Sequence, residues 1–179
     1  MSAYGELLDK NTVRFERLLP GPIERVWSYI VESDKRRQWL CAGDIGPGDG
    51  ENVDMHFHNE TLSQAEDIET PEKYRDLPSE MQFTGTVTRW DPPYAVSHTW
   101  EFDDEESSEV CYELEEVGDK VRLVLTHRRL ETGDTVLSVS GGWHTHLDIL
   151  VDVLEGREPK AFWKTHSALE AEYEKRLNA

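Results

Sequence analysis

The chain has few cysteines and no long apolar runs. Of its 179 residues only two are cysteines, Cys41 and Cys111. Two cysteines cannot build the disulfide framework of a small secreted domain, so reduced thiols in a cytoplasmic protein are predicted. Residues 1–10 show no basic start followed by an apolar stretch, and a signal peptide is not expected. No stretch is apolar for long enough to predict a membrane-spanning helix.

Positive charge is also scarce. The chain has 19 Lys and Arg residues against 37 Asp and Glu residues, which gives a formal net charge of -18. Nucleic-acid binding needs clustered Lys and Arg, so it is excluded as a function. Binding to an anionic membrane surface is excluded for the same reason. The acidity itself predicts a well-solvated surface.

Familiar catalytic and metal-binding motifs are missing as well. The glycine-rich run over residues 43–50 lacks the Lys-Ser/Thr ending of a phosphate-binding loop, and no Gly-x-Ser-x-Gly elbow occurs. His56 and His58 share one strand face, about 6.6 Å apart along the strand, but that face is predicted to point to solvent. His144 and His146 would point in different directions from a helix. No metal site and no cofactor are predicted.

What the chain has instead is a series of alternating apolar and polar stretches. This alternation predicts strands over residues 12–19, 51–58, 81–90, 94–102, 109–116 and 120–129. Asp91-Pro92-Pro93 predicts a turn between two of the strands, and a hairpin turn is centred on Gly118. Consecutive strands with short links form an antiparallel meander that is polar on one face.

Two short helices are predicted after the first strand. Pro22 suits the first turn of a helix, and apolar residues then recur at helical spacing over residues 23–30. Ser33 or Asp34 could cap a second short helix that reaches Leu40.

A long helix is predicted to follow the strands. It begins near Asp134, ends before Gly156 and carries one apolar face, made of Val139, Trp143, Leu147, Leu150 and Leu154. A tail helix beyond Pro159 carries a second stripe, which could pack on its own domain or on a second copy of the protein: Phe162, His166, Leu169, Tyr173 and Leu177. Residues 1–179 are predicted to form one domain, with a core of about 12–156 and an extra C-terminal helix over 157–179.

Residues 59–79 differ from the rest of the chain. They are acidic, contain Pro71 and Pro78, and show no sustained periodicity. They are predicted to form an irregular insertion, or a short strand followed by a mobile loop. Loops of this length are uncommon in compact domains and are often functional. A cavity lid is one hypothesis for this segment, and a plain surface excursion is the other.

The segments and their order carry a family resemblance. Four segments, which together cover most of residues 12–156, match it: Arg17-x-Leu19-Pro20-Gly21-Pro22 with Glu24-x-Val26-Trp27; Gly85-x-Val87, Asp91-Pro92-Pro93-Tyr94-x-Val96 and Thr99-Trp100; Glu109-Val110-x-Tyr112-Glu113-Leu114 with Leu123-x-Leu125-Thr126-His127; and Gly142-Trp143-x-x-x-Leu147-Asp148-x-Leu150-x-x-x-Leu154-x-Gly156. In order and spacing, the chain resembles the bacterial activator of Hsp90 ATPase homologue 1-like proteins of the SRPBCC, START-like or Bet v 1-like superfamily. It departs from the family pattern where adjacent glycines are split as Gly48 and Gly50, and in its longer tail from Arg157 onward.

The resemblance implies an α+β helix-grip fold. In that fold a curved antiparallel sheet wraps around the long C-terminal helix, and a cavity lies between the two. Members of the superfamily bind lipids, hormones or polyketides, and a few are cyclases or aromatases, so the fold does not fix the function. The eukaryotic activators also use a separate N-terminal domain with an Asn-rich Trp-His-Trp motif, which does not occur in this sequence.

Strand parity predicts which side chains face that cavity. In the strand over residues 94–102, Val96, His98, Trp100 and Phe102 share one face, and the same alternation selects residues elsewhere. The predicted ligand-binding residues are Trp39, Met55, Phe57, Phe83, His98, Trp100, Tyr112, His127, Trp143 and Leu147. Apolar faces with a few polar tips are typical of binding sites. In an ordinary core, the N–H group of a buried Trp or the O–H group of a buried Tyr also needs a hydrogen-bond partner. This need could explain the same mixture of apolar and polar groups.

Three functions are compatible with these residues. The first is binding of a small hydrophobic or aromatic ligand, with His98 and His127 orienting its polar end. The second is a cyclase/aromatase-like or hydrolase-like enzyme that uses His98 or His127 as a proton carrier, since imidazole titrates near neutral pH. The third is an interaction module, which would self-associate as a homodimer or contact a chaperone of the Hsp90 type through its acidic face or its tail helix.

Overall fold

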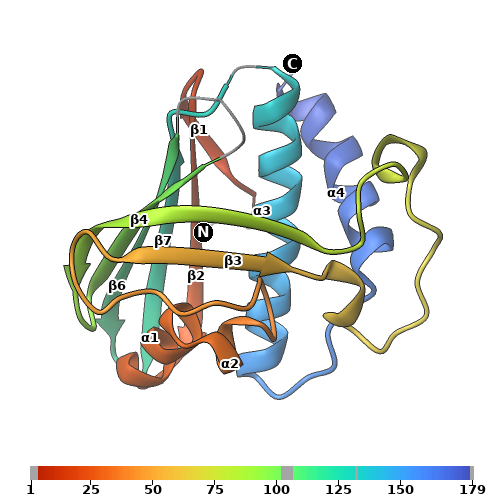
Figure 1. Cartoon of the computed structure of the whole chain (residues 1–179). Coiled ribbons are helices and arrows are strands. Elements are labelled where there is room, and N and C mark those ends of the chain that lie inside the picture. The colour runs from red at the N-terminus through yellow and green to blue at the C-terminus, as the bar shows by residue number, and fades with distance from the viewer. Residues whose placement is uncertain (1–3, 102–106, 132, 178–179) are drawn as a thin grey trace.

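One curved antiparallel sheet wraps around a long helix in the computed structural model, which describes residues 4–101, 107–131 and 133–177 (Figure 1). The predicted α+β helix-grip fold is therefore confirmed. The sheet is 7-stranded, with the order β1-β2-β7-β6-β5-β4-β3. The strands are β1 (Glu6–Asp9), β2 (Thr12–Pro20), β3 (Asn52–Phe57), β4 (Met81–Asp91), β5 (Ala95–Trp100), β6 (Ser108–Val117) and β7 (Lys120–Arg128).

The alternation of apolar and polar residues gives the sheet one buried face. In β7, for example, every second residue is buried, and β2 follows the same rule over most of its length. The two strands pair antiparallel with Phe15 opposite Leu125, so their inner faces merge into one apolar surface. The register between β4 and β5 shifts between Val87 and Arg89. A bulge of this kind bends a strand and increases its twist, which helps the sheet to curve around a helix.

Two details of the sheet differ from the prediction. β1 was not predicted, because it has 4 residues, all exposed, and therefore no buried face to produce an alternating pattern. It pairs with β2 as an edge strand of the sheet. Phe102, which was predicted to continue the inner face of β5, lies outside the described residues.

The long helix and the tail helix form two layers beyond the sheet, and two short helices lie at one end of it (Figure 1). Their bounds are α1 (Ile23–Val31), α2 (Ser33–Arg36), α3 (Asp134–Leu154) and α4 (Phe162–Leu177). α3 lies against the concave side of the sheet, and α4 packs on α3 on the side away from the sheet (Figure 1). The tail helix thus packs on its own chain, where the Tyr173 hydroxyl lies 3.0 Å from Nδ1 of His144. Within the described part of the chain, no helix has the length and apolar character needed to cross a bilayer.

Residues 58–80, which we call the β3–β4 segment, form the irregular insertion that was one of the two predicted alternatives. The segment contains two short 3-10 helices, Asn59–Thr61 (η1) and Glu72–Tyr74 (η2). It runs beside α4 (Figure 1). The Asp67 carboxylate accepts hydrogen bonds from the backbone N–H groups of Trp163 and Lys164, at 2.7 and 2.8 Å. A side chain of this segment therefore caps the start of α4.

Candidate ligand pocket

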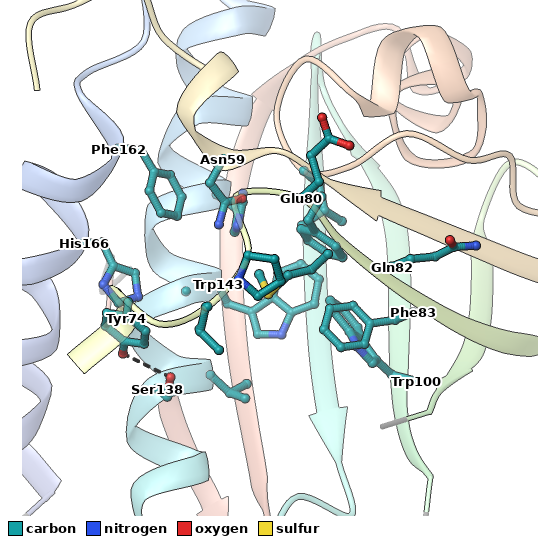
Figure 2. Close-up of a pocket in the computed structure, with 18 of the residues that line it drawn as sticks. Asn59, Tyr74, Glu80, Gln82, Phe83, Trp100, Ser138, Trp143, Phe162 and His166 are labelled. Atoms are coloured by element: carbon teal, nitrogen blue, oxygen red, sulfur yellow. Dashed lines mark hydrogen bonds between the residues drawn. The ribbon is translucent and has the colours of Figure 1, made fainter. Parts of the chain in front are cut away.

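A pocket of about 630 Å³ opens between the sheet, α3, α4 and the β3–β4 segment (Figure 2). The sheet side is lined by Phe57, Met81, Gln82, Phe83, Trp100 and His127. The helices contribute Ser138, Val139, Gly142, Trp143, His146, Phe162, Trp163 and His166. The rest of the wall is made of Leu40, Asn59, Tyr74, Leu77, Pro78 and Glu80. A cavity of this size suits a drug-sized molecule.

One wall of the pocket is aromatic. The ring of Trp100 lies 5.4 Å from Phe57, 5.9 Å from Phe83 and 5.8 Å, edge to face, from Trp143, measured between ring centroids. Aromatic pairs in these arrangements attract one another beyond the burial of their area. The rings belong to β3, β4, β5 and α3, so this wall is assembled only when the sheet has closed on the long helix.

The structure separates the predicted ligand-binding residues into two groups. The pocket is lined by Phe57, Phe83, Trp100, His127 and Trp143. The others lie in the core and do not line the pocket: Trp39, Met55, His98, Tyr112 and Leu147. Strand parity predicts which residues face inward, but it does not predict which of those residues reach the pocket. The ring of His98, for example, stacks on that of Trp100 at 6.4 Å, and only Trp100 reaches the pocket.

His127 uses both ring nitrogens for hydrogen bonds within the protein. The indole N–H of Trp143 donates to Nδ1 of His127 over 3.0 Å, so Nδ1 carries no proton. Nε2 therefore carries the proton and donates to the hydroxyl of Ser108 at 2.7 Å. Burial, with His98 nearby, lowers the pKa of His127 to about 3. The imidazole is neutral, and neither nitrogen is left to exchange a proton with a bound molecule.

His98 belongs to a polar group in the core around Arg36. Nδ1 of His98 donates to the backbone carbonyl of Thr99 at 2.8 Å. Burial, together with the charge of Arg36, lowers the pKa of His98 to about 3. Burial also raises the pKa of Tyr112, although the Arg36 guanidinium opposes that shift. Arg36 itself is fully buried and donates to the carbonyl of Gly43 at 3.1 Å. This group lies outside the lining of the pocket.

The opposite wall is polar and joins the β3–β4 segment to both helices. The Tyr74 hydroxyl donates to the Glu170 carboxylate at 2.7 Å and lies 3.2 Å from the hydroxyl of Ser138 (Figure 2). Lys73 is hydrogen-bonded to the same carboxylate. Burial opposes ionisation of Glu170, but the hydrogen bonds from Lys73 and Tyr74 outweigh it and lower its pKa. The ring of Tyr74 stacks on Trp163 with centroids 5.4 Å apart.

Two further imidazoles come from the helices. Nδ1 of His146 lies 2.8 Å from the backbone carbonyl of Trp39 and must donate to it, because a carbonyl oxygen only accepts. Burial lowers the pKa of His146 to about 4. Burial also lowers the pKa of His166, although the negative charge of Glu170 acts to raise it. Both rings are therefore neutral at physiological pH, and in His146 the unprotonated Nε2 is an acceptor.

His56 and His58 differ in burial, and His144 and His146 differ in direction. His56 is exposed, and His58 is half-buried with its Nδ1 3.6 Å from the carboxylate of Glu80. His144 and His146 diverge, one toward Tyr173 and the other toward the carbonyl of Trp39. Within the described ranges, no group of three or more His, Cys, Asp or Glu side chains could hold a metal ion. Both cysteines are free thiols.

Several pocket residues were not identified from the sequence. Tyr74 and Asn59 lie in the segment without periodicity, where no pattern indicates which way a side chain points. His146 carried a usable signal, since it follows Trp143 by three positions and so shares its helix face. His166 was placed on the stripe of the tail helix, but the sequence could not show that this stripe reaches the pocket.

Comparison with known proteins identifies relatives of the chain. A family model described as "Activator of Hsp90 ATPase homolog 1-like protein" matches residues 20–155, which is more than half of the 179 residues. A solution NMR structure of a protein from Bordetella parapertussis matches with a TM-score of 0.79 and 41% sequence identity, over 98% of this chain and 91% of that chain.

More distant structures share the fold. CalU16 from Micromonospora echinospora matches with a TM-score of 0.67 and 18% identity, over 94% of this chain and 89% of that chain. A structure described as the Aha1 dimer from Colwellia psychrerythraea matches with a TM-score of 0.58 and 18% identity, over 80% of this chain and 96% of that chain. At these identities the likeness concerns the fold alone. No curated protein matches the chain.

Proposed function

Because the chain belongs to the Activator of Hsp90 ATPase homolog 1-like family, we propose that it uses its helix-grip fold to bind a small hydrophobic or aromatic molecule. The binding site is the pocket between the sheet, α3, α4 and the β3–β4 segment. The observation that carries this proposal is the make-up of a pocket of about 630 Å³, which combines a wall of aromatic rings with an opposite wall that carries polar groups. Ligand sites are typically built in this way.

The core residues that do not line the pocket have a supporting role in this proposal. Trp39 donates from its indole N–H to the carbonyl of Tyr29 at 2.7 Å, and its own carbonyl accepts from His146. Met55 and Leu147 are buried in the hydrophobic core. We propose that these residues fix the wall on which the ligand rests. We also propose that the described residues act as one domain in which α4 completes the pocket.

The test of the proposal is a fluorescence titration with the uncharged probe N-phenyl-1-naphthylamine, whose emission rises in apolar surroundings. Trp100→Ala removes the ring at the centre of the aromatic wall and should weaken binding at least tenfold, since burial of one large ring contributes on the order of 1.5–3 kcal/mol. Trp90→Ala is the matched control, because Trp90 packs on Trp27 and does not line the pocket. Equal affinities of the two variants would count against this pocket, provided that circular dichroism shows both folded.

Self-association is a second proposal, and it rests on a different observation. The fold is shared with a structure from Colwellia psychrerythraea that is described as a dimer. We propose that this chain also forms a homodimer. Sedimentation velocity over a range of concentrations tests this proposal, and a monomer at every concentration would contradict it. A chaperone partner of the Hsp90 type rests on the family's description alone and is the weaker alternative.

A further inference from the structure

The pocket has no positive charge of its own. Among the residues that the structure describes, none of those lining the pocket is lysine or arginine, and the residues outside the description include no lysine or arginine. Lys73 adjoins the lining residue Tyr74, but it is already paired with the Glu170 carboxylate. A carboxylate, sulfonate or phosphate group buried in this pocket would lack a counter-ion, and burying an unpaired ion is costly.

The imidazoles of the pocket do not replace a cation. His127 is held neutral by its two hydrogen bonds, one accepted from Trp143 and one donated to Ser108. His146 donates from Nδ1 to a backbone carbonyl, which leaves an acceptor at Nε2. His166 is 5% exposed, and the carboxylate that it faces is Glu170 at 4.0 Å. None of these rings presents a charged donor to a bound anion.

What the pocket offers favours positive charge and hydrogen-bond donors. The faces of aromatic rings carry partial negative charge and attract cations. Oδ1 of Asn59 is buried and has no hydrogen-bond partner among the described residues, and Figure 2 shows Asn59 among the residues that line the pocket. Glu80 is the one lining residue with a charged side chain in the described ranges; it is an acid, but its side chain is 78% exposed and its carboxylate lies 3.6 Å from Nδ1 of His58. The indole N–H of Trp163, also buried without a partner there, is a neutral donor suited to a hydroxyl or a carbonyl.

We infer that the pocket selects aromatic amines and other uncharged or positively charged aromatic molecules, and that it rejects aromatic acids. This inference rests on the proposed function, because it specifies the chemistry of the same site. The net charge of -18 attracts cations to the whole surface. An experiment must therefore distinguish a preference of the pocket from a general attraction to an acidic protein.

The test uses three naphthalene probes that differ only in one substituent: 1-naphthylmethylamine, 1-naphthylmethanol and 1-naphthoate. Each is titrated into the full-length protein by isothermal titration calorimetry at pH 7, at low and at high salt. We expect the amine and the alcohol to bind at least tenfold more tightly than the naphthoate. The difference between the alcohol and the naphthoate should persist at high salt, because salt screens exposed charges much more than buried ones.

A pair of leucine variants connects the preference to the pocket. Leu77 lines the pocket and is 50% exposed, so a lysine at this position should be tolerated by the fold. Leu77→Lys should raise the affinity for naphthoate about tenfold. Leu8→Lys makes the same chemical change at a leucine that is 52% exposed and lies on β1, away from the lining. It should leave the naphthoate affinity unchanged.

The outcomes separate the inference from the function on which it rests. If none of the probes binds, the proposed function fails, and the inference fails with it. If naphthoate binds as tightly as the alcohol and the amine, the pocket binds ligands but the inference about charge is wrong. If both lysine variants raise the naphthoate affinity equally, net charge rather than the pocket sets the preference, and the inference is again overturned.

Discussion

The indole N–H of Trp143 donates to Nδ1 of His127 over 3.0 Å, and this hydrogen bond joins the long helix to β7 in the wall of the pocket. It fixes the tautomer of His127, because an accepting nitrogen carries no proton. The second nitrogen is fixed by Ser108 at 2.7 Å. A protonated His127 would present a donor to the Trp143 donor. The folded state is therefore built around the neutral ring.

This relationship predicts how stability depends on pH. The pKa of His127 is about 3 in the folded protein, against an ordinary value of 6.5. Between these values the unfolded chain binds a proton that the folded chain does not, so stability falls as the pH is lowered from about 6.5 toward 3. In His127→Gln the amide can still accept from Trp143 and donate to Ser108, but it does not titrate. Urea unfolding at pH 7, 6, 5 and 4 should show a smaller loss of stability for this variant, by up to about 1.4 kcal/mol per pH unit.

The control for this prediction is His56→Gln. It makes the same substitution at a ring that is exposed in the folded protein and does not line the pocket. If His127→Gln and the wild type lose stability in parallel, then His127 is protonated in the folded state and the tautomer assignment is incorrect.

The sequence predicts most elements of the fold because most of them have a buried face. Strand alternation and the apolar stripe on α3 both indicate burial, and together they predict that Trp100 and Trp143 lie on facing surfaces. β1 gave no such signal, because none of its residues is buried. The family resemblance then indicated how these elements wrap around one another, which local patterns do not encode.

The sequence predicted the pocket only in part, because its boundary depends on contacts between distant segments. Tyr74 reaches the pocket because its hydroxyl bonds to Glu170, 96 positions away along the chain. Nothing in the local sequence around Tyr74 predicts that contact. Conversely, strand parity places His98 and Tyr112 correctly on the inner face. It does not show that the ring of Trp100 packs on His98, and that of Trp143 on Tyr112, so that neither residue lines the pocket.

Gly85 is predicted to be intolerant of any side chain. A Cβ atom at this position would lie 1.9 Å from the backbone carbonyl oxygen of Thr99 on β5. The position of a Cβ atom is fixed by its own backbone, and the oxygen that it would meet is also backbone, so the two strands would have to separate. Gly85→Ala should therefore lower the free energy of unfolding by about 1–3 kcal/mol. Thr84→Ala, at an exposed neighbouring position of β4, is the control and should change stability much less. Equal stabilities, measured by urea denaturation, would show that the strands do not approach so closely.

Asp67 is predicted to hold the start of α4 in place. Its carboxylate accepts from the backbone N–H groups of Trp163 and Lys164. Asp67→Ala should lower stability by about 1 kcal/mol, as the loss of a helix cap does. It should also speed amide exchange in the first turn of α4, measured by hydrogen–deuterium exchange. Asp76→Ala removes an exposed carboxylate from the same segment and should have neither effect. If the two variants behave alike, the β3–β4 segment does not cap α4.

Gly142 gives two predictions, one for stability and one for ligand binding. It lies within α3 and lines the pocket, and a Cβ atom there would meet nothing within 4 Å. A glycine inside a helix is destabilising by about 1 kcal/mol relative to alanine. Gly142→Ala should therefore stabilise the protein by up to that amount in urea denaturation. Gly142→Leu should fill the pocket and weaken the binding of N-phenyl-1-naphthylamine at least tenfold, while the protein stays folded.

The neighbouring glycine separates the two effects. A Cβ atom on Gly141 would lie 3.6 Å from the Cα of Glu170, an ordinary contact between α3 and α4 outside the pocket lining. Gly141→Ala should therefore gain helix stability and keep the wild-type affinity for the probe. Suppose instead that Gly142→Leu binds the probe as tightly as Gly141→Ala. The probe would then occupy a different site, because a leucine side chain and a bound ring cannot share the space that the glycine leaves open.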